Sequence, residues 1–320
     1  MKHFLQLIRY KNLLIIVATQ FIMRYGLFYA MLKQYRIMNV TLELQLPFMQ
    51  FLFLVLATVF ICAAGYIIND YFDVNMDMIN KPDSVIVGKH ISRRIVMLWH
   101  WIFNVIGILL GVVVSVHIGH WNFAFLFIFI ASLLWLYSTS FSKQAFVGNI
   151  IVALLVAMVP LIVAIYELIP LNYMYHRVLS KMYLSFEALM FWSLGYALFA
   201  FLLSLIREMV KDIEDFEGDA AFGRNTIPIV FGIPVAKFIV MAIYIITLGA
   251  LLFVFVAYLQ DIPSGVYMFL GIIIPLGISA FLFLRAQSSK NYSRVSLLLK
   301  GVMLLGLLYI PFKHYVCMYV

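Results

Sequence analysis

The chain has 320 residues, of which 65% are hydrophobic and only 11% are charged, and its mean hydropathy is +1.05. A soluble domain carries about a quarter charged residues, so the composition excludes a soluble globular protein and indicates a membrane protein. The formal net charge of +8 does not indicate a nucleic-acid partner, because the basic residues are distributed as membrane topology requires.

Apolar runs of about 18–25 residues are long enough to cross the hydrocarbon core of a bilayer as helices. The sequence contains nine such runs, and no linker rich in Pro, Gly or Ser divides them. We therefore expect an all-α integral membrane protein with a single transmembrane domain over residues 1–320. The expected helices lie near residues 13–33, 47–69, 95–116, 121–138, 148–168, 187–207, 235–258, 264–284 and 296–316.

Basic residues distinguish the two sides of this expected bundle. With nine helices the termini lie on opposite sides, and 16 of the 22 Lys and Arg residues fall on or next to the segments on the N-terminal side. Cytoplasmic segments carry an excess of Lys and Arg, so we expect the N-terminus in the cytoplasm and the C-terminus outside. Ten of the 14 Asp and Glu residues also lie on this side, in residues 70–83 and 208–219, and topology alone does not explain them.

The first acidic cluster follows the second apolar run. If the helix continues, Asn69, Asp73 and Asp77 are spaced i, i+4 and i+8 with Asp70 beside them, so their side chains share one face about 5–6 Å apart. Neighbouring carboxylates at a membrane boundary repel one another, which indicates that a cation lies among them. Magnesium is the expected ion, since it is held by one or two carboxylates together with substrate phosphates. The alternative is a solvated helix end that happens to be acidic.

The second acidic cluster follows the sixth apolar run. Asp212, Asp215 and Asp219 repeat the stripe at i, i+3 and i+7, and Gly218 is expected to interrupt the helix nearby. Arg207 and Lys211 lie one turn apart at the same depth and are placed to bind phosphate oxygens. A ladder of salt bridges within this helix is the alternative interpretation.

The two motifs resemble those of the UbiA superfamily of intramembrane prenyltransferases. Asn69, Asp70, Asp73 and Asp77 match the family's first aspartate motif, and Asp215 and Asp219 resemble its second. Within that superfamily, residues 211–219 followed by 223–229 are similar to the archaeal branch that transfers geranylgeranyl groups to geranylgeranylglyceryl phosphate. Many members carry Arg-Pro after the Asn-Lys-Pro at residues 80–82, whereas this chain has Asp83, Ser84 and Val85.

The resemblance implies nine helices around a central apolar chamber and transfer of a prenyl group, with geranylgeranyl expected, from a prenyl diphosphate to a lipophilic acceptor. Mg²⁺ is the implied cofactor, and geranylgeranylglyceryl phosphate is the implied acceptor. Two alternatives are an aromatic prenyltransferase, which shares much of the second motif, and a membrane transporter, because intramembrane acids also mark ion pathways.

The resemblance also assigns roles to individual residues. Arg9 and Asn12 look like the family's Arg-x-x-Asn element, in which the arginine helps to bind diphosphate, and Tyr137 and Lys143 look like its Tyr/Lys element. The residues expected to carry catalysis are Asp73, Asp215, Lys143 and Tyr137. The diphosphate is expected to contact Arg9, Asn12, Asn69, Lys143, Arg207 and Lys211. The expected metal ligands are Asn69, Asp70, Asp73, Asp77, Asp212, Asp215 and Asp219.

Overall fold

The computed structural model describes residues 2–33, 36–37, 40–182 and 186–316. Within these ranges nine helical stretches are long and apolar enough to cross a membrane, as the sequence predicts. They span Tyr10–Leu32, Phe48–Asn80, Arg93–His117, Trp121–Thr139, Val147–Tyr175, Glu187–Glu214, Ile233–Tyr258, Ile262–Arg285 and Ser289–Tyr315.

The chain divides into two compact units, and the expectation of one domain stays a prediction. Unit 1 consists of Met1–Ser142 and Met158–Leu194, and unit 2 consists of Lys143–Ala157 and Gly195–Val320. The elements that lie wholly in unit 1 are α1 (Lys2–Leu7), α2 (Tyr10–Phe21), η1 (Ile22–Tyr29), α3 (Ala30–Leu32), β1 (Arg36–Ile37), β2 (Val40–Thr41), α4 (Phe48–Asn80), η2 (Pro82–Ser84), α5 (Arg93–His117), η3 (Trp121–Phe123) and α6 (Ala124–Thr139).

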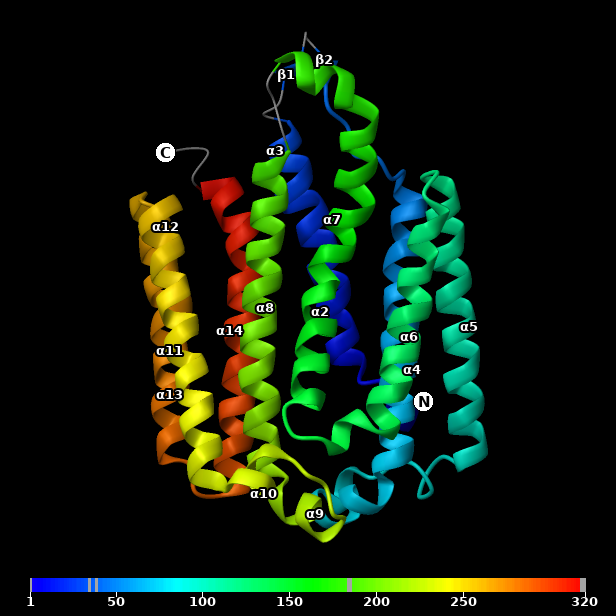
Figure 1. Cartoon of the computed structure of the whole chain (residues 1–320), viewed down its shortest axis with the longest axis vertical. Coiled ribbons are helices and arrows are strands. Elements are labelled where there is room, and N and C mark those ends of the chain that lie inside the picture. The colour runs from blue at the N-terminus through cyan, green and yellow to red at the C-terminus, as the bar shows by residue number, and fades with distance from the viewer. Residues whose placement is uncertain (1, 34–35, 38–39, 183–185, 317–320) are drawn as a thin grey trace. The chain divides into compact units, whose positions relative to one another are not determined.

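Two long helices contribute residues to both units, and so does a short 3₁₀ turn. These are α7 (Val147–Met182), α8 (Glu187–Glu214) and η4 (Phe141–Lys143) (Figure 1). The elements of unit 2 alone are α9 (Phe216–Ala221), α10 (Ile227–Phe231), α11 (Ile233–Tyr258), α12 (Ile262–Tyr267), η5 (Met268–Ile273), α13 (Ile274–Arg285) and α14 (Ser289–Val316). The strands β1 and β2 form one short antiparallel pair, and its backbone register pairs residue 37 with residue 40.

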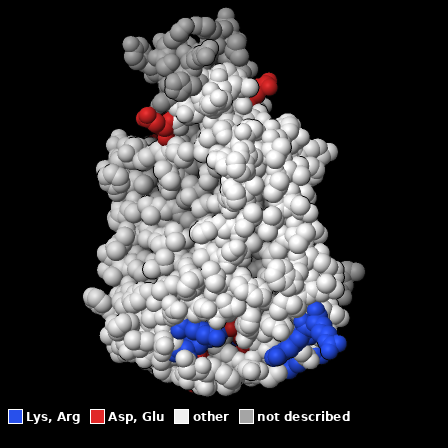
Figure 2. All heavy atoms as spheres, turned by 45° about the vertical axis from the view of Figure 1, so that its right-hand side comes forward, with Lys and Arg blue, Asp and Glu red and all other residues white. Residues whose placement is uncertain are grey.

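Charged residues lie mostly at helix ends and in the connections between helices. On the face shown in Figure 2, Lys, Arg, Asp and Glu lie towards the two ends, and other residue types cover the surface between them. Exposed Leu, Ile, Val and Phe side chains are frequent along the candidate spans, for example Leu109 at 59% and Phe253 at 64% exposed. Such a surface suits contact with lipid tails, because burying apolar side chains from water is favourable.

One ion pair is an exception and is buried within unit 1. Arg24 in η1 and Glu167 in α7 are joined by an Nε–Oε1 contact of 2.9 Å, and their side chains are 3% and 1% exposed. Glu167 Oε2 also accepts hydrogen bonds from the backbone N–H groups of Gln45, at 2.7 Å, and Leu46, at 3.3 Å. The Arg24 guanidinium lies 4.2 Å from the ring centroid of Phe51. A buried charge needs such partners, and here they fix the segment that leads into α4.

Close packing between α4 and α5 depends on a glycine. A Cβ atom at Gly107 would lie 2.7 Å from Cγ1 of Ile61 and 3.1 Å from the carbonyl oxygen of Ala57. The second of these atoms belongs to the backbone of α4, so a side chain at position 107 forces the two helices apart. Glycine therefore sets the separation of α4, which carries the first acidic cluster, from α5.

We expect Gly107→Ala to lower the melting temperature of the detergent-solubilised protein by about 2–5 °C, because overpacking costs about 1–3 kcal/mol. Intrinsic tryptophan fluorescence during heating measures the change. Gly249→Ala is the matched control, since Gly249 lies in α11, where a Cβ atom would meet none of the described residues within 4 Å, and alanine favours a helix. Equal melting temperatures for the two variants would contradict the close-packing argument.

Candidate active site

The first acidic cluster lies on the last turns of α4, which continues past the apolar run to Asn80 as the stripe requires. The Asn69 side-chain amide donates a hydrogen bond of 2.9 Å from Nδ2 to Oδ2 of Asp73, the residue one turn further along. Asp73 is 7% exposed, whereas Asp70 and Asp77 are less buried. The helix therefore presents Asn69, Asp70, Asp73 and Asp77 over three successive turns, with Asp73 the most enclosed.

Arg9 reaches this cluster from the junction of α1 and α2. Its Nη2 atom donates to Oδ1 of Asp70 at 2.7 Å, and its guanidinium lies 5.0 Å from the ring centroid of Tyr66, one turn earlier on α4. The backbone of Arg9 is left-handed, with φ 51° and ψ 50°. Asn12 lies in the first turn of α2 and donates its backbone N–H to the Arg9 carbonyl oxygen at 2.8 Å. The structure thus brings the expected Arg-x-x-Asn element to the first acidic cluster.

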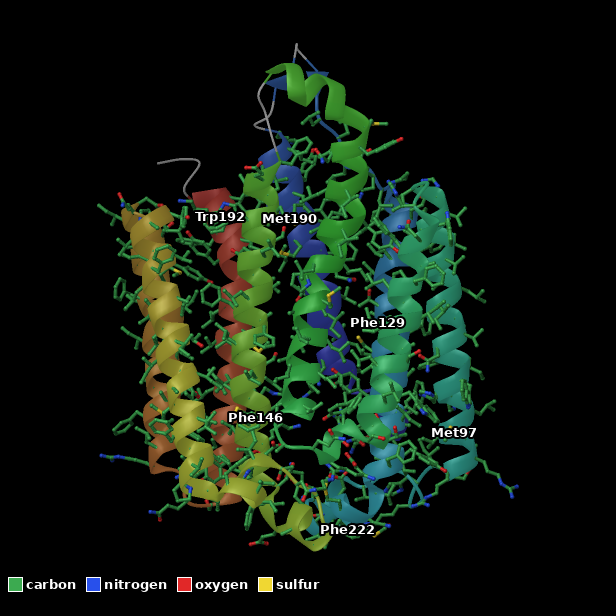
Figure 3. All side chains as sticks on the ribbon, in the orientation of Figure 1. Met97, Phe129, Phe146, Met190, Trp192 and Phe222 are labelled. Carbon is green, nitrogen blue, oxygen red and sulfur yellow. The ribbon has the colours of Figure 1, made fainter. Side chains whose placement is uncertain are left out.

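The second acidic cluster differs from the sequence prediction in where its helix ends. The helix α8 stops at Glu214, and Asp215 has φ −96° and ψ 12° between α8 and α9. Gly218 does not interrupt the helix, because it lies buried inside α9. Asp215 makes no side-chain capping hydrogen bond to α9, while the backbone N–H of Asp219 donates to the Asp215 carbonyl oxygen at 3.1 Å. Asp212, Asp215 and Asp219 thus belong to two successive helices, and the chain continues to Phe222 at the end of α9 (Figure 3).

Two acids of the second cluster have partners within unit 2. Asp212 Oδ2 accepts a hydrogen bond of 2.9 Å from Nδ2 of Asn149 in α7, and Asn149 is only 6% exposed. Asp219, 3% exposed, has its Oδ1 atom 3.8 Å from Nε of Arg224. The loop that carries Arg224 is anchored further, since the Asn225 N–H donates to the Lys143 carbonyl oxygen at 2.9 Å.

The basic residues of α8 lie just before the second cluster in the chain. Arg207 Nη1 forms an ion pair with Glu208, and both side chains are about 15% exposed. Among the residues that the structure describes, none accepts a hydrogen bond from the buried Nε atom of Arg207. Lys211 is half-buried one turn further along. The salt-bridge ladder that the sequence suggested joins Arg207, Lys211 and Asp215, and the ion pair between Arg207 and Glu208 is not part of it.

Tyr137 and Lys143 belong to different units, because unit 1 ends at Ser142 in this part of the chain and unit 2 begins at Lys143. Tyr137 is half-buried in the last turn of α6 in unit 1, and Lys143 is exposed at the end of η4 in unit 2. The first acidic cluster likewise belongs to unit 1 and the second to unit 2.

The donor types fit a hard divalent cation. Across the described part of the chain, no three His, Cys, Asp or Glu side chains are grouped closely enough to enclose a metal ion by themselves. Carboxylate and amide oxygens are the ligands that Mg²⁺ prefers, and it commonly takes one or two carboxylates with phosphate and water. The pairs Asn69–Asp73 and Asn149–Asp212 each hold a carboxylate beside an amide group. The buried Arg207 Nε atom supplies a donor that suits a phosphate oxygen.

Three residues that contact the clusters were not predicted from the sequence as part of the site. Asn149 follows the Tyr/Lys element and holds Asp212, Arg224 pairs with Asp219, and Glu208 pairs with Arg207. Glu208 is adjacent to Arg207 and Arg224 is five residues from Asp219, and neither spacing places the two side chains on one helix face, so periodicity did not indicate these pairs. Asn149 is 63 residues from Asp212, and no local pattern connects them.

Comparison with known proteins relates most of the chain to one family. The sequence model of the UbiA prenyltransferase family matches residues 37–305. Digeranylgeranylglyceryl phosphate synthase from Thermococcus kodakarensis is 32% identical over 256 residues, which cover 80% of this chain and 82% of the relative. The enzyme of the same name from Thermococcus sibiricus is 33% identical over 75% of this chain and 76% of its own length.

Solved structures share the fold. A structure of digeranylgeranylglyceryl phosphate synthase in membranes has a TM-score of 0.62 and 22% identity, with 98% of each chain covered. A UbiA homologue from Archaeoglobus fulgidus bound to DMAPP and Mg²⁺ has a TM-score of 0.54 and 15% identity, with 94% of this chain and 98% of that chain covered. With the family match over most of the sequence, these similarities show that the chain is a multi-pass membrane protein and a prenyltransferase of the UbiA family.

Proposed function

We propose that this prenyltransferase transfers a prenyl group, with geranylgeranyl as the expected donor group, from a prenyl diphosphate to the hydroxyl of geranylgeranylglyceryl phosphate. The relatives that are about 30% identical over about 80% of the chain are digeranylgeranylglyceryl phosphate synthases, which supports this acceptor. The reaction breaks the C–O bond between the prenyl group and the diphosphate and forms a C–O ether bond to the acceptor. The hydroxyl proton and the diphosphate leave.

The proposal rests on a hydrogen bond between an asparagine and an aspartate that occurs at both acidic clusters. In each cluster an asparagine Nδ2 atom lies 2.9 Å from an aspartate oxygen, in Asn69–Asp73 and in Asn149–Asp212. A hydrogen bond of this kind fixes the rotamer of the carboxylate and keeps its second oxygen oriented for another ligand. A diphosphate carries negative charge on both phosphate groups. Two oriented carboxylates, each able to hold a metal ion, therefore fit a metal-bound diphosphate better than one does.

We propose that Asn69, Asp70, Asp73, Asp77, Asp212, Asp215 and Asp219 hold Mg²⁺ together with the diphosphate. Bound there, the metal would supply positive charge that stabilises the diphosphate as a leaving group. Arg9, Arg207, Lys211 and Lys143 are proposed to bind phosphate oxygens, Arg9 through the guanidinium that Asp70 and Tyr66 orient. Asn12 and Asn69 are also proposed to bind the diphosphate, and Tyr137 is proposed to face the allylic cation that develops when the C–O bond breaks.

The acidic helix ends are proposed to face the cytoplasm. The excess of Lys and Arg on the N-terminal side of the nine spans supports this orientation. The prenyl tails of donor and acceptor would then be taken from the cytoplasmic half of the bilayer, and the charged diphosphate would remain near water.

The function is tested by incubating the purified protein with geranylgeranyl diphosphate, Mg²⁺ and a panel of acceptors, followed by mass spectrometry. We expect an ether of geranylgeranylglyceryl phosphate with a second geranylgeranyl group. A prenylated aromatic ring in its place would assign the chain to the aromatic branch.

In sealed vesicles, added diphosphate should react only when the cytoplasmic face is outward, and turnover in the opposite orientation would contradict the proposed topology.

Neutralising one carboxylate in each cluster tests the two-cluster mechanism. We expect Asp73→Asn and Asp215→Asn each to lower kcat by about a hundredfold or more, because the leaving diphosphate loses charge stabilisation. Asp83→Asn is the matched control, since Asp83 is an exposed carboxylate in η2, six residues beyond Asp77. Melting temperatures within about 2 °C of the wild type would show that the proteins are folded. Full activity in either cluster variant would exclude that cluster from the reaction.

Metal removal tests the proposed cofactor. We expect excess EDTA to reduce prenyl transfer to background and added Mg²⁺ to restore it, because the carboxylates and the diphosphate repel one another without a cation. Radiolabelled product formation before and after dialysis measures the effect. Undiminished turnover in chelator would show that Arg and Lys side chains alone neutralise the diphosphate.

A further inference from the structure

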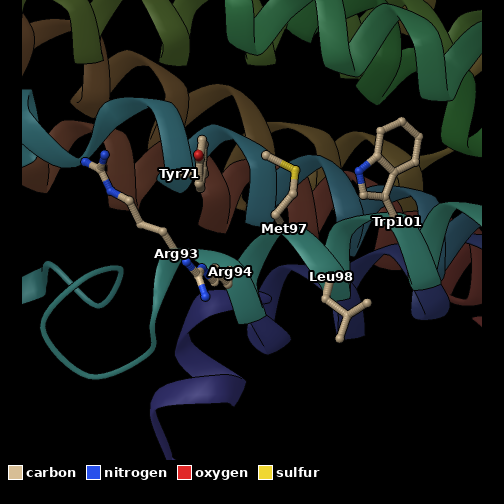
Figure 4. A pocket seen from close by; sticks show the side chains of 6 residues that line it. All are labelled: Tyr71, Arg93, Arg94, Met97, Leu98 and Trp101. Carbon is tan, nitrogen blue, oxygen red and sulfur yellow. The ribbon is translucent and has the colours of Figure 1, made fainter.

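A surface cavity lies between α4 and α5 on unit 1 and is not part of either acidic cluster. Its volume is about 440 Å³, and it is lined by Tyr71 of α4 and by Arg93, Arg94, Met97, Leu98 and Trp101 of α5 (Figure 4). The guanidinium of Arg93 lies 5.8 Å from the ring centroid of Tyr71. The cavity is therefore bounded by side chains from two helices.

Along the axis of α5, the charged lining residues lie at the start of the helix and the apolar lining residues lie further along it. Arg93, Met97 and Trp101 are spaced i, i+4 and i+8 and form one row, and Arg94 and Leu98 form a second row beside it. Both rows begin with a guanidinium at the start of the helix and continue with apolar side chains. A ligand that fills this cavity needs an anionic head and an apolar tail.

The position of the cavity along the candidate span matches this polarity. The helix α5 is one of the membrane-spanning helices, and it begins at Arg93. Leu98 is 58% exposed and Trp101 is 55% exposed, so this side of α5 is an outer surface of unit 1. Arginine at the end of a span lies at the depth of the headgroups, and Trp101, eight residues or about 12 Å further along the helix, lies at the depth of the acyl chains. The arginines are thus placed at headgroup depth and the apolar residues deeper.

The cavity lies on a different face of α4 from the acidic stripe. A helix turns about 100° per residue, so Tyr71 points about 200° away from Asp73 and about 100° away from Asp70. Asp70 is engaged by Arg9, and Asp73 by Asn69. A molecule held beside Tyr71 therefore occupies a separate site from one held by Asp73, which favours a lipid of the bilayer over the reacting acceptor.

We propose that this cavity binds an anionic phospholipid of the cytoplasmic leaflet. Arg93 and Arg94 bind the phosphate group, and one acyl chain lies along Met97, Leu98 and Trp101. Among the described residues, the lining holds two guanidinium groups and no acidic side chain, which favours a headgroup with net negative charge over a zwitterionic one.

Native mass spectrometry of the full-length protein after graded delipidation tests the site. The protein is mixed with phosphatidylglycerol, phosphatidylcholine, inorganic phosphate or geranylgeranylglyceryl phosphate, and bound molecules are counted. We expect the double variant Arg93→Gln/Arg94→Gln to bind one phosphatidylglycerol fewer than the wild type at limiting lipid, with affinity for that molecule lowered about tenfold or more. Arg285→Gln is the matched control, since Arg285 is exposed at the end of α13 and lies 4.4 Å from the ring centroid of Phe281.

The competing lipids decide the source of the ligand. The proposal is supported if the wild type and Arg285→Gln retain phosphatidylglycerol but not phosphatidylcholine, and if the double variant loses the phosphatidylglycerol. Equal retention by the wild type and the double variant overturns it. Displacement of phosphatidylglycerol from this site by stoichiometric geranylgeranylglyceryl phosphate also overturns it, because the cavity is then an acceptor site. The count does not depend on prenyl transfer, so the proposed reaction can fail while the lipid site stands.

Discussion

The structure depends on the cost of placing charge in a medium that cannot solvate it. Within a bilayer, a charged side chain must lie near the boundary or have partners that replace water. Arg24 and Glu167 meet this requirement in the interior of unit 1, where the carboxylate receives two backbone N–H groups and the guanidinium lies over Phe51. Most other acids lie at the ends of helices, and ten of the 14 gather in two segments. Carboxylates gathered in this way repel one another, and bound cations or hydrogen-bond donors have to offset the repulsion.

The partners of these acids are of two kinds, and the difference has a chemical consequence. Asn69 and Asn149 are neutral donors, so they orient Asp73 and Asp212 without reducing the negative charge that attracts a cation. Arg9 and Arg224 are charged, and each neutralises one acid at the edge of its cluster. Each cluster therefore combines a carboxylate that is oriented but keeps its charge with a second carboxylate that lies beside a guanidinium. This combination is what binding of a metal–diphosphate complex requires.

Hydropathy predicted the nine spans because length and apolarity alone decide whether a helix can cross a bilayer. The extension of α4 to Asn80 lies beyond the expected span at residues 47–69, and it meets the condition on which the stripe of Asn69, Asp73 and Asp77 depended. The break at Asp215 was not predicted, since the i, i+3, i+7 spacing is compatible with one helix or two. The contact between Asn149 and Asp212 could not be predicted either, because it depends on how α7 and α8 pack and not on local sequence. Periodicity identifies the acids, but only tertiary packing identifies their partners.

The backbone of Arg9 shows how packing can fix a functional side chain. A left-handed conformation in a non-glycine residue costs on the order of 1 kcal/mol or more, and a partly exposed ion pair such as Arg9–Asp70 returns less than about 1 kcal/mol. The ion pair alone therefore does not account for the conformation. Leu7 of α1 is fully buried and Leu13 of α2 is 7% exposed, so both short helices are anchored in the same core and the bend between them falls at residues 8–9. The apolar core thus determines the turn, and the turn directs the guanidinium to Asp70. The backbone of Arg9 therefore keeps its conformation when a substrate competes with Asp70 for the guanidinium, because that conformation does not depend on the ion pair.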